Sequence, residues 1–276
     1  MCFIAASLVA CPGSAVTLYD ASLGNMPGDQ GFLYLANELT PAATVSYSGG
    51  LTELNTMVDR SESAGFFTHN PFNGSPIHPA APLLDRTVGY VVSFDLQMLG
   101  EGHNARDDNS DGKQDRAGFS VIAIGNDLQG IELGFFHDDV ANEIWAYEDN
   151  VANPGDLFTQ AEGVDRTVAQ TAALTTYDLT VAGDGYELSV GGTAILSGLL
   201  RDYTAFEGPS FPLVGELDPY EQPNMLFFGD DTSSADSHVR LGNISVTAVP
   251  EPSAGLLLLV AGVALFCKVA VSLRKT

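Results

Sequence analysis

The sequence is poor in positive charge. Its 276 residues include 35 Asp and Glu but only 11 Lys and Arg, which gives a formal net charge of −24. A surface this acidic repels the phosphates of nucleic acids and the headgroups of anionic lipids. Nucleic acid is therefore excluded as a partner. Neutral polysaccharide, divalent cations and plain solvation all remain compatible with the acidity.

Cysteine is also scarce, and it is confined to the two ends of the chain. The three cysteines are Cys2, Cys11 and Cys267, so residues 16–248 contain none. Structural disulfides, thiolate catalysis and cysteine metal sites are therefore excluded from this segment. A body of roughly 230 residues is large enough to be stabilised by its core alone.

Long amphipathic helical patterns are missing as well, and residues 196–206 are the best segment for even a short helix. Short alternating runs dominate, and Asp184-Gly185 and Gly191-Gly192 between them are strong hairpin signals. The pattern predicts an all-β protein, an antiparallel β-sandwich or jelly roll. The predicted strands are residues 90–96, 118–124, 131–136, 143–147, 177–181, 186–190, 193–196, 225–228 and 239–246.

The run YDLTVAGDGYELSVGGTAILSG at residues 177–198, followed late in the chain by VRLGNISV, resembles concanavalin-like and laminin-G-like domains. The resemblance implies a jelly-roll sandwich whose first strand pairs with its last. Residues 16–84 fit this pattern less well, because Pro71, Pro76, Pro79 and Pro82 make this part rich in loops. Phe66-Phe67, Phe135-Phe136 and Phe227-Phe228 each place one ring on either face of a strand.

The N-terminal segment has the pattern of an export signal. Residues 1–15 read MCFIAASLVACPGSA, an apolar core followed by the small residues Gly13 and Ala15. This predicts a signal peptide cleaved before Val16, although its basic n-region is missing. The alternative is a lipobox at residues 8–11 with Cys11 as the lipidated residue.

The C-terminal segment, residues 249–276, begins with a Pro-Glu-Pro box at Pro250, Glu251 and Pro252. An apolar run over residues 254–273, interrupted by Lys268, is long enough for a transmembrane helix, and a basic tail follows. This order resembles the PEP-CTERM sorting signal. The resemblance implies an exosortase as partner, an exported protein in the cell envelope or on its outer surface, and at least transient membrane anchoring.

An acidic loop between two predicted strands matches the pattern of a calcium-binding loop. Its sequence, DDNSDGKQD, starts at Asp107 and has oxygen-bearing residues at alternate positions and a glycine at the turn. We expect a structural Ca²⁺ ion there, the alternative being a charged turn. The predicted ligands are Asp107, Asn109, Asp111, the Lys113 carbonyl and Asp115.

A glycoside hydrolase is the alternative from another class of function. Residues 216–221, ELDPYE, match the E-x-D-x-x-E spacing of laminarinase-type enzymes, with Glu216 and Glu221 as the two catalytic carboxylates. Pro219 argues against a regular strand, and a Pro-rich acidic loop is the structural alternative.

Two further clusters have residue types found in binding sites. Trp145 and Tyr147 share one face of a strand and could form an exposed platform for carbohydrate, although such rings more often lie in the core. His137, Asp138 and Asp139 with Glu143 form an acidic cluster, and Asp230-Asp231 could add to a rim of carboxylates. The sequence thus predicts a non-catalytic surface or extracellular-matrix protein that binds carbohydrate or acts in adhesion, with extracellular polysaccharide as a partner. A ligand-free structural envelope protein is the third reading.

Overall fold

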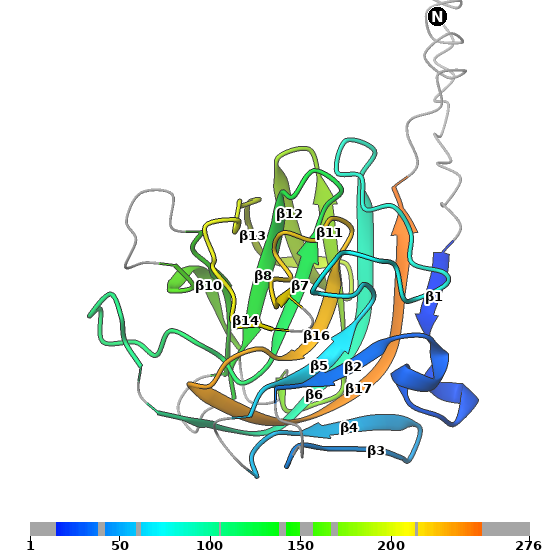
Figure 1. Ribbon diagram of the computed structural model, residues 1–276, viewed down its shortest axis with the longest axis horizontal. Coiled ribbons are helices and arrows are strands. Elements are labelled where there is room, and N and C mark those ends of the chain that lie inside the picture. Colours follow the sequence, from blue (N-terminus) through cyan, green and yellow to red (C-terminus); the bar gives the residue numbers. More distant parts are fainter. Residues whose placement is uncertain are drawn as a thin grey trace, which may run out of the picture.

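The computed structural model describes residues 15–37, 42–58, 62–104, 106–137, 142–149, 157–166, 171–212 and 215–249. Every strand pairing in these ranges is antiparallel, and two large sheets pack face to face (Figure 1). The prediction of an all-β, antiparallel two-sheet body is confirmed. The only helical elements named in the described ranges are two 3-10 turns, η1 (Ala21–Leu23) and η2 (Pro27–Gln30).

The first sheet has eight strands and is organised around the two longest, β6 and β17, which pair along most of their length. β1 and β4 both pair with the other edge of β17, so the first strand does lie beside the last, as predicted. In spatial order the strands are β13 (Thr193–Leu199), β12 (Gly185–Val190), β11 (Thr175–Ala182), β6 (Tyr90–His103), β17 (Ala235–Ala248), β4 (Leu51–Asn55) and β3 (Thr44–Ser48), with β1 (Ala15–Tyr19) also on β17.

The second sheet has seven strands, and its centre is formed by β8, β7 and β16. A separate two-stranded ribbon consists of β14 (Ser210–Phe211) and β15 (Gly215–Glu216). In spatial order the seven strands are β10 (Gln160–Arg166), β9 (Asn142–Tyr147), β8 (Gly130–Phe135), β7 (Ser120–Ile124), β16 (Leu226–Asp230), β5 (Ala64–Phe67) and β2 (Leu33–Ala36).

The short helix expected at residues 196–206 is not formed, and that prediction is wrong. β13 continues to Leu199 because its backbone pairs with β12, with Tyr186 opposite Gly198. Leu196 points into the core, whereas Leu199 is 70% exposed at the end of the strand. The pairing with a neighbouring strand overrides the local helical pattern.

The seven-stranded sheet is apolar on both faces, and this creates two cores. Phe66, Phe135 and Phe228 point into the main core between the sheets. Their sequence neighbours Phe67, Phe136 and Phe227 point to the opposite side, into a second cluster on the outer face of the sheet. The prediction that each Phe-Phe pair is split across a strand is confirmed. The outer cluster includes Tyr203, Tyr220 and Phe206 from the loops that cover this face.

Both terminal segments predicted for targeting lie outside the described residues, apart from Ala15 and Val249. This applies to residues 1–14, to Pro250, Glu251 and Pro252, and to the predicted transmembrane helix at 254–273. Among the described residues, none of the helices has the length and apolar character needed to span a bilayer.

Candidate functional site: an aromatic cavity on the outer face of the seven-stranded sheet

The outer face of the seven-stranded sheet carries a cavity of about 830 Å³. Strands β2, β5, β7 and β16 form its floor through Leu35, Gly65, Ile122 and Phe227. Gly65 is required in this floor, because a Cβ atom there would collide with the ring of Phe227. The absence of a side chain on β5 therefore lets the Phe227 ring lie against the strand.

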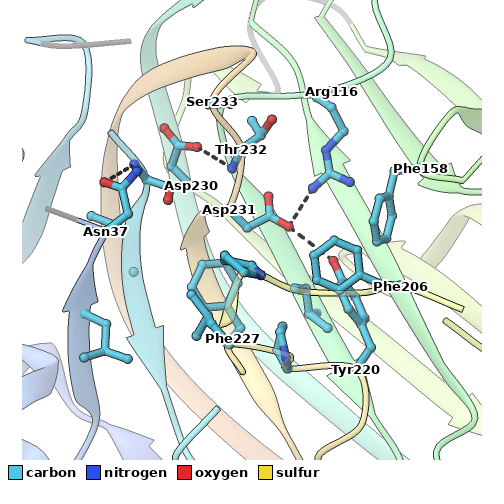
Figure 2. Close-up of a pocket in the computed structure, with 18 of the residues that line it drawn as sticks. Asn37, Arg116, Phe158, Phe206, Tyr220, Phe227, Asp230, Asp231, Thr232 and Ser233 are labelled. Atoms are coloured by element: carbon cyan, nitrogen blue, oxygen red, sulfur yellow. Dashed lines mark hydrogen bonds and ion pairs between the residues drawn. The ribbon is translucent and has the colours of Figure 1, made fainter. Parts of the chain in front are cut away.

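Seven aromatic residues line the cavity, and Figure 2 shows Phe158, Phe206, Tyr220 and Phe227 among them. Phe158 is the centre of one group, with its ring centroid 5.1 Å from that of Tyr220 and 5.5 Å from that of Phe206. Phe72 and Phe211 form a second, edge-to-face pair 6.3 Å apart. A cavity with this many rings offers several faces on which the C–H surface of a ligand can pack.

Four charged or polar side chains meet next to the cavity, and Arg116 is at their centre. Its Nη2 atom donates to Glu132 Oε1 at 2.9 Å and to Asp231 Oδ2 at 2.6 Å. The Tyr220 hydroxyl donates to Glu132 Oε2 at 2.6 Å. These residues come from four separate segments, and Figure 2 shows Arg116, Asp231 and Tyr220 pointing toward one another. We refer to Arg116, Glu132, Tyr220 and Asp231 as the ionic cluster.

The guanidinium of Arg116 is held between two aromatic rings. Its Cζ atom lies 4.8 Å from the ring centroid of Tyr147 and 4.5 Å from that of Phe158. The residue is only 6% exposed, yet Nε and Nη1 have no hydrogen-bond partner within the described part of the chain. Asp231 Oδ1 also lacks a partner there. Buried polar atoms are nearly always paired in proteins, so these three atoms are exceptions to that rule.

Burial dominates the electrostatics of the ionic cluster. Desolvation raises the pKa of Glu132 to about 8; Arg116 opposes this rise and Asp231 adds to it. Burial also raises the pKa of Tyr220, and the two carboxylates add to the effect. With two acids around one guanidinium, the cluster does not carry a net positive charge.

Acidic side chains also line the cavity. Asp108, Asp115 and Asp230 line it together with Arg106, which binds Asp108 through Nε at 2.7 Å. Burial raises the pKa of Asp230, whose carboxylate accepts from the Thr56 hydroxyl at 2.6 Å. The sequence suggestion that Asp230-Asp231 joins a group of carboxylates is therefore met, although Asp230 is buried rather than in an exposed turn.

The predicted calcium loop is closed by its own hydrogen bonds. Both carboxylate oxygens of Asp107 accept backbone N–H groups, from Asp111 and Gly112, and Asn109 also accepts from Asp111. Asp115 turns away to accept from the Asp108 backbone at 2.5 Å. Within the described ranges, no group of three His, Cys, Asp or Glu side chains is placed to hold a metal ion. The arrangement does not present a ready set of ligands, and Ca²⁺ stays a prediction.

The lysine of this loop has a different role. The Lys113 ammonium lies 4.1 Å from the ring centroid of Trp145, and the Trp145 indole donates to Glu143 Oε2 at 2.5 Å. Trp145 is half-buried in this arrangement. Tyr147 is fully buried beneath Arg116, so the expectation of an exposed Trp145–Tyr147 platform is wrong for Tyr147. The ring is covered because the outer face of this sheet has a core of its own.

The hydrolase motif does not form one strand. Glu216 ends β15, and Glu221 lies in a turn beyond Pro219, so the two carboxyls do not alternate along a ladder as the motif requires. The residues between them serve the cavity instead, since Leu217, Pro219 and Tyr220 line it. Of the other acidic cluster, Asp138 and Asp139 lie outside the described residues.

Sequence reasoning missed the ionic cluster. Arg116, Glu132 and Tyr220 lie far apart in the sequence and meet only through the fold. One signal was present: Glu132 is a single acid inside the apolar run IELGFF, and a charged residue in a buried strand has a partner.

Comparisons with known proteins give likenesses of fold only. No protein-family model matches the chain, and no curated protein sequence does. A carbohydrate esterase of the Shiga toxin-encoding bacteriophage phi24B is 14% identical with a TM-score of 0.47, over 85% of this chain and 99% of the other. A Bacillus subtilis protein of unknown function with a galectin-like fold is 11% identical with a TM-score of 0.45, over 87% and 99%. The exoplasmic/lumenal domain of VIP36, in a form bound to Ca²⁺ and Man3GlcNAc, is 9% identical with a TM-score of 0.45, over 85% and 89%. Likenesses this distant carry no argument about function.

Proposed function

We propose that this protein is a non-catalytic carbohydrate-binding protein of the cell surface, and that the outer-face cavity is its binding site. The observation that carries the proposal is a cavity whose lining combines seven aromatic residues with the charged residues Arg116 and Asp231. Sugars have the matching surface, because their C–H faces pack on rings while their hydroxyl groups both donate and accept hydrogen bonds.

The size and charge of the cavity favour the same class of ligand. About 830 Å³ is within the range of ligand pockets, and it is ample for a short oligosaccharide. The net charge of −24 repels anionic ligands, so a neutral glycan suits this protein better than a sulfated or uronic one.

Non-catalytic function is part of the proposal. Glu132 is 0% exposed and so cannot touch a glycosidic bond, and Glu216 and Glu221 do not line the cavity. A glycoside hydrolase remains the alternative; glycan hydrolysis that is lost in Glu216→Gln would favour it. We further propose that the body is of the concanavalin-like class and reaches the surface through the PEP-CTERM-like tail.

Binding of the full-length protein, purified in detergent, to an array of neutral, amino and acidic glycans tests the proposal. The cavity variant is Phe206→Ala, which removes one ring from the wall. The matched control is Leu199→Ala, which removes an exposed apolar side chain from β13 in the other sheet.

We expect binding of a neutral glycan that Phe206→Ala weakens about tenfold, since the loss of one well-packed ring contact costs on the order of 1 kcal/mol. Leu199→Ala should leave it unchanged. Equal weakening by both variants, or binding to no glycan on the array, would contradict the proposal.

A further inference from the structure

The two ends of the cavity differ in polarity, and the register of the strands in its floor fixes which end is which. Phe67 of β5 lies opposite both Leu33 of β2 and Phe227 of β16, and Phe227 lies opposite Ile122 of β7. This row across the sheet is entirely apolar. Phe67, Ile122 and Phe227 all line the cavity, and we call this part of it the apolar end.

The polar end of the cavity lies three residues farther along the same strands. There Ala64 of β5 is opposite both Ala36 of β2 and Asp230 of β16. The segments that continue from this row supply the four Asn, Ser and Thr residues of the described lining, which are Asn37, Ser63, Thr232 and Ser233. Figure 2 shows Asn37, Thr232 and Ser233 on one side of the cavity, and Phe206, Tyr220 and Phe227 on the other.

Loops extend the apolar end beyond the sheet. The Pro71 carbonyl, just after β5, accepts from the backbone of Asp218 at 3.2 Å, and the backbone of Leu217 donates to the Pro209 carbonyl at 3.0 Å. Phe72, the next residue after Pro71, packs edge to face on Phe211 of β14. Leu217, Phe72 and Phe211 line the cavity, so this end is enclosed by carbon atoms on several sides.

A plain oligosaccharide matches only part of this lining. Its rings carry hydroxyl groups all round, and a hydroxyl at the apolar end would lose its hydration beside Ile122, Leu217 and Phe227, whose side chains have no polar atom to replace the water. A purely apolar molecule fails in the opposite way, because it would cover Thr232 and Ser233 at the polar end. A molecule that suits both ends has an apolar group on one side and hydroxyl groups on the other.

The charges at the polar end argue against an ionic head group. Both arginines of the lining are paired with an aspartate, Arg106 with Asp108 and Arg116 with Asp231. A phosphate or carboxylate would therefore meet neutralised guanidinium groups and further acids. Those further acids are also engaged, since Asp115 accepts from the Asp108 backbone and Asp230 from the Thr56 hydroxyl, and neither is a free partner for an ammonium group. A neutral head group with hydroxyls suits this end best.

We propose that the cavity binds a neutral sugar that carries an uncharged alkyl or acyl chain. The chain lies over Ile122 and Phe227 toward Phe211, and the sugar lies at the polar end beside Thr232 and Ser233. This inference rests on the proposed carbohydrate-binding function and adds the class of glycan that the cavity accepts.

Isothermal titration with methyl, butyl and hexyl β-glucoside tests the inference, and hexan-1-ol is the probe without a sugar. The full-length protein is held in phosphatidylcholine nanodiscs, because a detergent has an alkyl chain of its own that would compete; empty nanodiscs give the baseline. The variant is Leu217→Asn, which places an amide at the apolar end. The matched control is Leu51→Asn, which changes a leucine that is also half-buried, on β4 of the other sheet.

We expect each added methylene to tighten binding about threefold to fourfold, so that hexyl glucoside binds about tenfold more tightly than butyl glucoside. The ratio should fall toward one in Leu217→Asn and stay unchanged in Leu51→Asn. Hexan-1-ol should bind about tenfold more weakly than hexyl glucoside, since it lacks the sugar hydroxyls. In saturation-transfer NMR the terminal methyl protons of the hexyl chain should receive more transfer than the protons of the sugar ring.

The outcomes separate this inference from the proposed function. Equal affinity of the methyl, butyl and hexyl glucosides overturns the inference and leaves carbohydrate binding standing. Equal affinity of hexan-1-ol and hexyl glucoside overturns both for this cavity, because the sugar would then contribute nothing. Binding of none of the four probes overturns the inference, while the glycan array decides carbohydrate binding separately. If Leu217→Asn does not fold, the chain-length series and the methyl signal of the wild type still decide the inference.

Discussion

The substitution Glu132→Gln should change how the stability of the protein depends on pH. Glu132 is fully buried and accepts from Arg116, Tyr220 and the Ser120 hydroxyl. Burial raises its pKa from 4.5 to about 8, so the folded protein keeps a proton that the unfolded chain releases at lower pH. Glutamine has nearly the same shape, accepts through its amide oxygen and has no charge to gain.

The sign and size follow from proton linkage. Between the two pKa values the folded state binds one more proton than the unfolded state, so stability falls as pH rises, by about 1.4 kcal/mol per unit. The stabilising contribution is fully present below the unfolded pKa of 4.5 and is lost as pH rises through about 8. From about pH 5 to about pH 8 the wild type should therefore lose on the order of 3 to 4 kcal/mol that Glu132→Gln does not lose.

Urea unfolding at several pH values, followed by fluorescence of the single tryptophan, gives the free energy of unfolding for both proteins. The informative quantity is the difference between variant and wild type, because other titrating groups cancel in it. Glu187→Gln is the control, since it removes the same charge from a solvated position. A difference between Glu132→Gln and wild type that stays constant across this pH range would refute the assignment of a proton to the buried carboxyl.

Three further predictions address other parts of the chain. His78 is buried and its Nε2 donates to the Leu18 carbonyl at 2.8 Å, and burial lowers the pKa of this imidazole. Its contribution to stability is therefore complete above about pH 6.5 and is lost as pH falls. His78→Gln should flatten the fall in melting temperature on acidification, and identical acid profiles of variant and wild type would contradict this. If residues 107–115 bind Ca²⁺, the ion at about 100 times its Kd should raise the free energy of unfolding by about 2.7 kcal/mol in the wild type and by less in Asp111→Asn. Identical unfolding curves with Ca²⁺ and with a chelator would show that this loop is a turn without a bound ion. Deletion of residues 249–276 should release the body into the medium or block its surface display, as followed by cell fractionation; unchanged location would rule out the sorting role.

Much of the fold could be predicted because the decisive signals are local. Turn signals predicted two hairpins of the eight-stranded sheet, at Asp184-Gly185 and at Gly191-Gly192, and the structure forms both hairpins, the first with its turn one residue earlier, at Gly183-Asp184. Alternation likewise placed one ring of each Phe-Phe pair on either face. The helix expected at residues 196–206 failed because the pairing of β13 with β12, a contact between strands, outweighs propensity.

The candidate site could not be predicted in the same way, because it is made by contacts distant in sequence. Arg116 and Asp231 are separated by 115 positions, yet their side chains are 2.6 Å apart. Local pattern can identify Glu132 as a buried charge, but it cannot choose the partner of that charge. The Glu216–Glu221 segment illustrates the opposite case: its spacing resembles a catalytic motif, but the prolines turn it into the loop that carries Tyr220 into the cavity wall.

The position of β17 has a consequence for how the protein is made. This strand pairs with β6 on one edge and with β4 and β1 on the other, so the first sheet is divided in two until residues 235–248 have been synthesised. A sheet whose central strand is the last to appear has mostly long-range contacts and folds slowly. In a protein that crosses a membrane before folding, as we propose for this chain, such a delay keeps the polypeptide unfolded while it is threaded through. The body then closes once β17 has arrived, and the start of β1 lies beside the end of β17, with Ala15 opposite Thr247 (Figure 1).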